Sequence, residues 1–147
     1  MALPAAASEA AVAESVTIRV YVEEVTQSIK DVPPKTLIGY EYTKGDTIRG
    51  TEILRNAVRQ FNKPTGANVG SDRYVIFAVA YQKVRADFVA RFPGGTVHAH
   101  DEGHRIGAEP KVPIVGGTGL YAGATGSIEG QHLANGKKLN IYRLQIP

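Results

Sequence analysis

Residues 111–126, which read KVPIVGGTGLYAGATG, constrain the fold more than any other stretch of this chain. An apolar β-forming run enters a Gly-Gly-Thr-Gly corner at 116–119, and a second corner of small residues follows at 122–126. Glycines after a strand are typical of dinucleotide-binding loops, but that motif opens a βαβ unit of about 30 residues with an acidic residue roughly 20 positions on. Only residues 127–147 follow, and they contain glycines and β-formers rather than a helix. The stretch therefore indicates glycines placed where a strongly coiled strand turns a barrel corner.

The composition is that of one all-β domain. A chain of 147 residues supports a single core or a small closed barrel, and sixteen glycines and eight prolines among many β-branched residues favour short strands. The absence of Cys excludes a disulfide framework and thiol chemistry. The net charge of +3 is spread without a basic run, which argues against a nucleic-acid partner, and no apolar run is long enough for a membrane-spanning helix.

The first fifteen residues are rich in Ala and contain neither a basic segment nor a long apolar one. We expect residues 1–15 to form a flexible tail and residues 16–147 to form a single β-barrel domain. The lack of a secretory signal pattern predicts a cytoplasmic protein.

Glu24 ends the apolar face of the first expected strand, in which Val16, Ile18, Val20 and Val22 alternate with polar residues. A carboxylate at this position lies either at a solvated rim or in a dry cavity. In a dry cavity, desolvation would raise the pKa of Glu24 and make it a usable acid or base.

Two later segments bear on the assembly and the strand count. Residues 51–61 fit a strand or a short helix equally well. Residues 72–84 form the strongest expected strand, with apolar residues on both faces. A strand that is dry on both sides has a packing partner on each. Because no helix is evident to cover the outer face, we expect a homo-oligomer, either a dimer or a trimer.

His98 and His100 share one strand face, with Glu102 and His104 nearby, and form the only cluster that resembles a metal site. A cupin-type site needs a more distant glutamate and a further histidine in a Gly/Pro strand, and His132 has the wrong surroundings. We therefore expect no metal. His98 and His100 are instead candidate acid–base groups, in the cavity or on the surface, because histidine titrates near neutrality.

The glycine corner carries a resemblance to a known family. Residues 113–121 followed by Gly126 resemble the G-G-T-G-x-F/Y…G signature of the dirigent and allene oxide cyclase superfamily. Gly123 stands where the cyclases carry a glycine, whereas Ala122 and Thr125 stand where plant dirigent proteins carry arginines. This favours the cyclase side. Weaker similarity reaches back to about Val16, including a spacing of Glu24 and a later proline that matches the cyclases.

The resemblance implies a closed antiparallel barrel of about eight strands, similar to the allene oxide cyclase barrel, whose interior holds one apolar small molecule. It also implies a cyclase or isomerase without a cofactor, which directs ring closure, including cycloaddition, of a polyketide or other specialised metabolite. We expect Glu24 first, and His98 or His100 second, to be catalytic. The expected cavity-lining residues, whose strand parity the sequence leaves open, are Tyr40, Tyr42, Phe77, Tyr81 and Tyr142.

Three other functions stay open at this stage. The barrel would serve as a lipocalin-like carrier if it binds an apolar ligand without turnover, or as a dirigent-type stereocontrol protein. A metal-dependent cupin-type enzyme is the third alternative.

Overall fold

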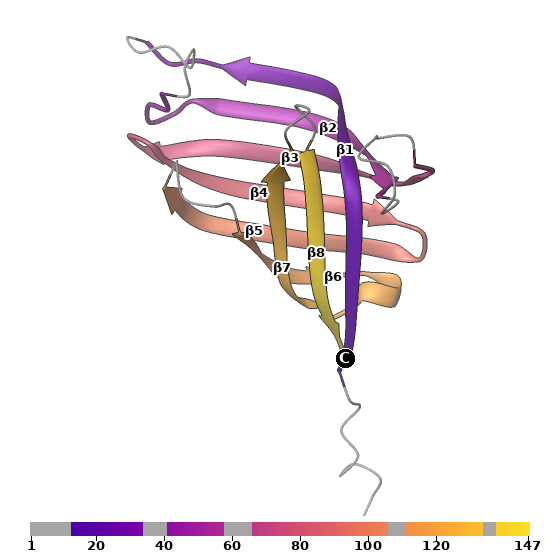
Figure 1. Ribbon diagram of the computed structural model, residues 1–147. Coiled ribbons are helices and arrows are strands. Elements are labelled where there is room, and N and C mark those ends of the chain that lie inside the picture. The colour runs from indigo at the N-terminus through magenta and orange to yellow at the C-terminus, as the bar shows by residue number, and fades with distance from the viewer. Residues whose placement is uncertain (1–12, 34–40, 58–65, 106–110, 134–137) are drawn as a thin grey trace, which may run out of the picture.

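The computed structural model describes residues 13–33, 41–57, 66–105, 111–133 and 138–147. Within these ranges the chain forms eight strands and one short 3-10 helix (Figure 1). No helix in these ranges is long and apolar enough to cross a membrane. The elements are β1 (Glu14–Lys30), β2 (Thr47–Asn56), β3 (Asn68–Ala80), β4 (Lys83–Phe92), β5 (Gly95–Arg105), β6 (Lys111–Gly117), η2 (Gly119–Tyr121), β7 (Thr125–His132) and β8 (Lys138–Ile146).

The strands close into an antiparallel barrel. Each strand pairs with the next one along the chain, and β1 pairs with β8 to complete the ring. In Figure 1, the first half of β1 runs beside β8 and β7, and this group crosses the direction of β2 to β5. The barrel confirms the fold expected from the glycine corner and from its family resemblance.

β1 belongs to both halves of the barrel because it bends. Its first part, as far as Val22, pairs with β8, and the part from Val20 to Lys30 pairs with β2. The register with β2 shifts between Glu24 and Thr26, which is the signature of a β-bulge. Beyond Val22, β1 therefore leaves β8, and Figure 1 shows its second half lying along β2.

Cross-strand pairing assigns each residue to the inward or the outward face. On β1 the apolar face of Val16, Ile18, Val20 and Val22 points inward, as the alternation predicts, and packs with a core that fills one end of the barrel. This core consists of Val20, Leu54, Ala90, Phe92, Val97, Ala99, Val112, Ile114, Ala124, Ile128, Tyr142 and Leu144. A smaller cluster of Tyr42, Ala78 and Val84 lies apart from it.

The inward row of β1 is exposed beyond its bulge. Gln27 pairs with Gly50, and Ile29 pairs with Ile48, so both belong to inward-facing rows. Nevertheless Gln27 is exposed, and Ile29 keeps 53% of its surface accessible. The inward row of β1 is therefore accessible to solvent where β1 has separated from β8.

The predicted glycine corner has the geometry that requires glycine. Gly119, in η2, has φ +61°, and a Cβ there would lie 2.1 Å from the carbonyl oxygen of Gly94. Gly126, at the start of β7, has φ +126°, and its Cβ would lie 1.9 Å from the carbonyl oxygen of Arg143. Both positions exclude a side chain because the backbone folds back on a neighbouring segment.

Several expected boundaries differ from the structure. Residues 51–56 belong to strand β2 and not to a helix. The expected strand over residues 72–84 is two strands, because Gln82 adopts φ +55° in a tight turn whose amide donates to the carbonyl of Tyr42. β1 begins at Glu14, inside the expected tail, and extends to Lys30.

Candidate functional site

Three acidic side chains lie next to one another on the inner face, and we call them the carboxyl row. Glu24 of β1 pairs with Glu52 of β2, and Glu52 pairs with Asp72 of β3. Glu24 is exposed, whereas Glu52 and Asp72 keep only 5% and 2% of their surface accessible. The row therefore runs from an exposed residue on β1 to buried residues on β2 and β3.

Several buried polar atoms around this row lack hydrogen bonds. Within the described ranges, both carboxyl oxygens of Asp72, the Oε1 atom of Glu52 and the hydroxyl of Tyr142 have no hydrogen-bond partner. Leaving a buried polar group unpaired costs about 1–3 kcal/mol, so native proteins rarely tolerate it without a reason. A ligand or water that completes these bonds would explain why they are kept.

Asp72 and Glu52 are buried carboxyl groups side by side. Burial, first, and the charge of Glu52 raise the pKa of Asp72 from 3.8 to about 8, and the charge of Lys138 opposes this. Like charges so close together resist double ionisation. At neutral pH Asp72 therefore keeps its proton.

Tyr142 supplies a buried hydroxyl close to this pair. Burial raises the pKa of Tyr142, and the charge of Asp72 raises it further, so the phenol remains a hydrogen-bond donor at any ordinary pH. Phe92 fixes the ring by an edge-to-face contact, with ring centroids 5.2 Å apart. Tyr142, an expected cavity-lining residue, thus lies inside the barrel as part of the core.

Tyr74 links the exposed end of the row to the barrel wall. Its hydroxyl donates to Oε1 of Glu24 at 3.2 Å and accepts from Nε2 of Gln27 at 3.3 Å. Burial raises the pKa of Tyr74 to about 12. Gly50 makes this position possible, because a Cβ there would lie 2.4 Å from the Tyr74 hydroxyl oxygen.

The other expected cavity-lining residues lie in different places. Tyr42 is buried in the smaller core cluster, and Tyr40 lies outside the described residues. Phe77 points outward, with the guanidinium of Arg85 5.4 Å from its ring centroid. Tyr81 is 57% exposed and donates to Oε1 of Glu41 at 2.8 Å. Among the expected cavity-lining residues that the structure describes, only Tyr142 approaches the carboxyl row.

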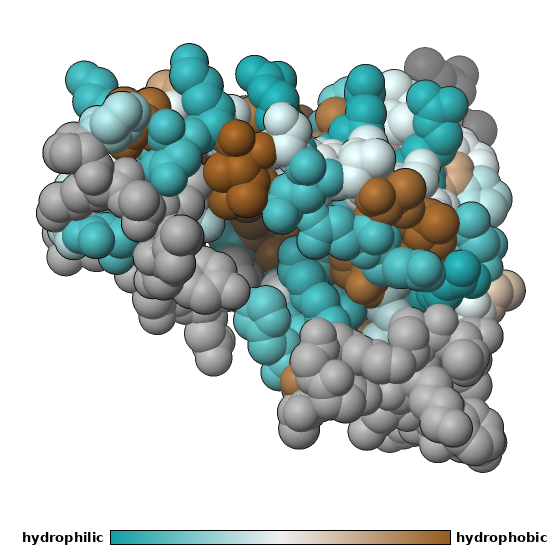
Figure 2. Space-filling view, turned by 90° about the horizontal axis from the view of Figure 1, so that it is seen from above, coloured by the Kyte–Doolittle hydropathy of each residue, from teal (hydrophilic) through white to brown (hydrophobic). Residues whose placement is uncertain are grey.

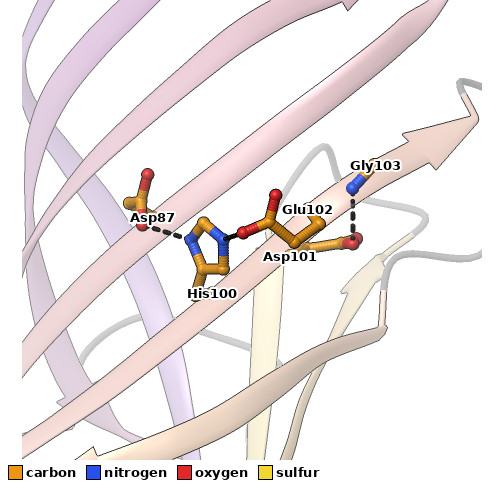
Figure 3. Close-up of polar contacts among 5 residues, drawn as sticks. All are labelled: Asp87, His100, Asp101, Glu102 and Gly103. Carbon is orange, nitrogen blue, oxygen red and sulfur yellow. Dashed lines mark hydrogen bonds and ion pairs between the residues drawn. The ribbon is translucent and has the colours of Figure 1, made fainter.

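His98 and His100 share one strand face as predicted, and that face is the outer one. Val97 and Ala99, which alternate with them, belong to the core. His100 lies between two carboxylates, with Nδ1 2.5 Å from Oδ1 of Asp87 and Nε2 2.5 Å from Oε1 of Glu102 (Figure 3). These hydrogen bonds, that to Asp87 first, raise the pKa of His100. No group of three or more potential metal ligands is arranged around an ion site in the described part of the chain.

A groove of about 440 Å³ crosses the outer face of β1 to β4. Its outward rows include Thr51, Arg73 and Val89, and then Arg49, Val75 and Asp87. Figure 2 shows an outer face of the molecule on which apolar groups are separated by hydrophilic side chains. The apolar outer residues expected on the strand at 72–84 are thus present, and Val75 lies in this groove.

Sequence reasoning missed Glu52 and Asp72. Acidic residues adjacent in sequence point to opposite faces of a strand, so the sequence pairs Glu23–Glu24 and Asp101–Glu102 offered no shared site. The pairing of β2 with β3 brings together acids that are 20 positions apart in sequence. The available signal was that Glu52 alternates with Ile48 and Leu54, and Asp72 with Tyr74 and Ile76, which places both acids on otherwise inward faces.

Comparisons with known proteins identify the fold. No protein-family model and no curated protein matches the sequence. Among solved structures, a pyocyanin demethylase has a TM-score of 0.70 at 21% identity, covering 88% of this chain and 99% of that chain. A pterocarpan synthase dirigent protein has a TM-score of 0.68 at 14% identity, covering 99% and 97%. The exo-specific intermolecular Diels-Alderase AbnU has a TM-score of 0.67 at 13% identity, covering 90% and 98%. The chain thus has the barrel fold that cyclases and dirigent proteins share.

Proposed function

We propose that this protein is a cyclase or isomerase that binds a flexible apolar molecule within the barrel and directs its stereoselective ring closure in specialised metabolism. One observation carries the proposal: the unpaired polar atoms of Glu52, Asp72 and Tyr142 adjoin an apolar core, and the row that contains Glu52 and Asp72 ends at the exposed Glu24. A few directional polar groups within apolar walls are what a small-molecule site needs to fix the orientation of its ligand.

The barrel would accelerate ring closure mainly by selecting a shape. Holding a flexible chain in one near-attack conformer can supply several kcal/mol of the barrier. The hydroxyl of Tyr142 would donate to a carbonyl oxygen of the substrate and stabilise the negative charge that gathers there. Each step rearranges electron pairs or protons within the substrate, so the proposed reaction requires no cofactor.

The fold neighbours support this class of chemistry without choosing the substrate. They include the Diels-Alderase AbnU, the Diels-Alderase AbmU, which comes from Streptomyces koyangensis, and a nonspecific heme-binding cyclase described as catalysing a [4 + 2] cycloaddition. They also include a demethylase and dirigent proteins, and one fold hosts many unrelated reactions. The fold neighbours therefore do not identify the substrate, and a polyketide substrate is part of our proposal.

The proposal assigns the polar roles to the inner face. Glu24 remains the predicted polar group at the open end, where it accepts the hydrogen bond from Tyr74. His98 and His100 receive no role in ring closure, because their side chains lie on the outer face and His100 is bound to Asp87 and Glu102.

The test uses a linear trienone in which a short methylene tether joins an enone to a diene, so that it closes slowly without a catalyst. Chiral chromatography would measure the rate of ring closure and the ratio of stereoisomers. We expect the wild type to accelerate closure and to favour one stereoisomer. Tyr142→Phe should lower the rate by about tenfold or more, because one oxyanion donor is removed. Tyr81→Phe removes a hydroxyl from the surface and is the matched control.

A stereocontrol or carrier protein is the second candidate, favoured by the dirigent neighbour that spans nearly the whole chain. Such a protein would bind the trienone without accelerating its closure. A dirigent-type protein would still change the isomer ratio, whereas a carrier would leave it at the value seen in buffer. Glu24→Gln adds a second distinction, because a carrier has no turnover to lose.

A further inference from the structure

We propose that Glu52 and Asp72 form a catalytic acid–base pair that moves a proton between two carbon atoms of a neutral, carbonyl-containing substrate. The site would then isomerise its substrate, for example to set the double bonds required for ring closure. This inference rests on the proposed function in one respect, because it places the substrate in the same barrel interior.

The structure holds the carboxyl groups of Glu52 and Asp72 side by side. Glu52 and Asp72 are direct cross-strand neighbours on two hydrogen-bonded strands, and the side chains of both are almost fully buried. The groups that face them come from two further strands: Glu24 from β1, and Lys138 and Tyr142 from β8. A pair that carries one proton contains an acid and a base at once, which is the arrangement that a proton shift needs.

The proton balance closes without a further reactant. The ionised carboxylate of the pair removes a proton from the carbon next to the carbonyl, and the electron pair of that C–H bond forms a conjugated enolate. Tyr142 donates a hydrogen bond to the enolate oxygen. The carboxyl group that held the original proton then transfers it to the distal carbon of the conjugated system. The pair begins and ends with one proton, and no atom is oxidised or reduced.

The charges of the site define the class of substrate. A substrate carboxylate or phosphate would approach Glu24 and the ionised member of the pair, and the resulting repulsion in a dry interior is large. A neutral ketone or ester avoids this repulsion and offers the oxygen that the Tyr142 hydroxyl lacks. We therefore expect neutral carbonyl compounds to bind and anions of the same shape to be rejected.

The test uses cyclohex-3-en-1-one, whose conversion to the conjugated ketone requires removal of a proton at one carbon and delivery at another. Ultraviolet absorbance would follow the conversion with the full-length wild type, Glu52→Gln, Asp72→Asn and the double variant. Glu23→Gln is the matched control, because Glu23 pairs with Arg55 on the outer face. Thermal melting would verify that each variant is folded.

We expect the wild type and Glu23→Gln to accelerate the conversion on the order of 10²-fold over buffer. Each single variant should fall to within about threefold of the double variant, because groups that act as one unit have non-additive effects. In deuterated water the product should carry deuterium at the distal carbon. The rate should also fall as the pH rises through about 8, where Asp72 loses its proton.

Equal rates for the wild type and the double variant, or an acceleration that both single variants retain, would overturn the pair. Where the ketone test fails in this way but the variants still close the trienone with the usual rate and isomer ratio, only the acid–base pair is overturned and the proposed function stands. If neither probe reacts with the wild type, the proposed function fails with it.

Discussion

Replacement of Asp72 by Asn should stabilise the folded protein at neutral pH. The folded state keeps the Asp72 proton far more tightly than the unfolded chain does, since its pKa is raised from 3.8 to about 8. When folding raises the pKa of a carboxyl group, the free energy of unfolding is greatest below the pKa of the unfolded state. It declines between the two pKa values and becomes constant above the pKa of the folded state. Asn has nearly the same shape, carries no charge to bury, and can donate its amide to Glu52.

The magnitude follows from the pKa difference. A difference of about four pH units corresponds to on the order of 5 kcal/mol between acid and alkaline solution. About three-quarters of this interval lies below pH 7. Because the structure can relax around a buried charge, we expect Asp72→Asn to gain on the order of 2–4 kcal/mol at pH 7. The gain should shrink toward zero near pH 4 and reach its maximum above pH 8.

Urea unfolding at fixed protein concentration and at pH 4.5, 7 and 9 would measure this. The matched control is Glu23→Gln on the outer face, which breaks an exposed pair with Arg55 and should change stability by less than about 1 kcal/mol with little growth toward high pH. A variant that is less stable than the wild type at pH 9, or a difference that does not grow with pH, would refute the reasoning about the buried pair.

Three further predictions concern the rest of the molecule. NMR titration should place the pKa of His100 above 6.5, and Asp87→Asn should lower that pKa; a titration at or below 6.5 would contradict the paired geometry. The stability that protonated His100 adds is full below pH 6.5 and is lost as the pH rises through the raised pKa. Gly50→Ala should destabilise the fold by about 1–3 kcal/mol in urea unfolding, because the added methyl group displaces the Tyr74 ring, and an unchanged midpoint would show that the ring can shift freely. We propose that the outer face of β3 forms a contact between copies of this chain, so light scattering should give a dimer or trimer for the wild type and a smaller species for Phe77→Glu, whereas a monomeric wild type would remove this contact.

The sequence predicts the barrel because its strongest local signals are those that a barrel uses. Gly119 and Gly126 lie where no side chain fits, and Val16 to Val22 alternate with the pleat of β1. These signals act over a few residues, so they can be recognised without knowledge of the tertiary structure. The turn at Gln82 escaped prediction because a non-glycine residue with φ +55° gives no such signal.

The site was harder to predict because it depends on register. Glu24 was identified from the end of an apolar stripe, but its partners Glu52 and Asp72 come from two other strands. Nothing within a single strand fixes which acid lies opposite which, and a slip of one residue would move each of them to the outer face. Phe77 and Tyr81 were expected in the cavity for the same reason, since both faces of that segment are apolar.

Carboxyl-carbon NMR of the wild type with added cyclohex-3-en-1-one tests most directly whether the carboxyl row is the functional site. We predict that Asp72 titrates near pH 8 in the free protein, and that the ketone and its conjugated product shift the carboxyl signals of Asp72 and Glu52 while leaving that of Asp87 in the outer groove unchanged. Titration of Asp72 near its ordinary pKa, or shifts confined to the outer groove, would contradict it.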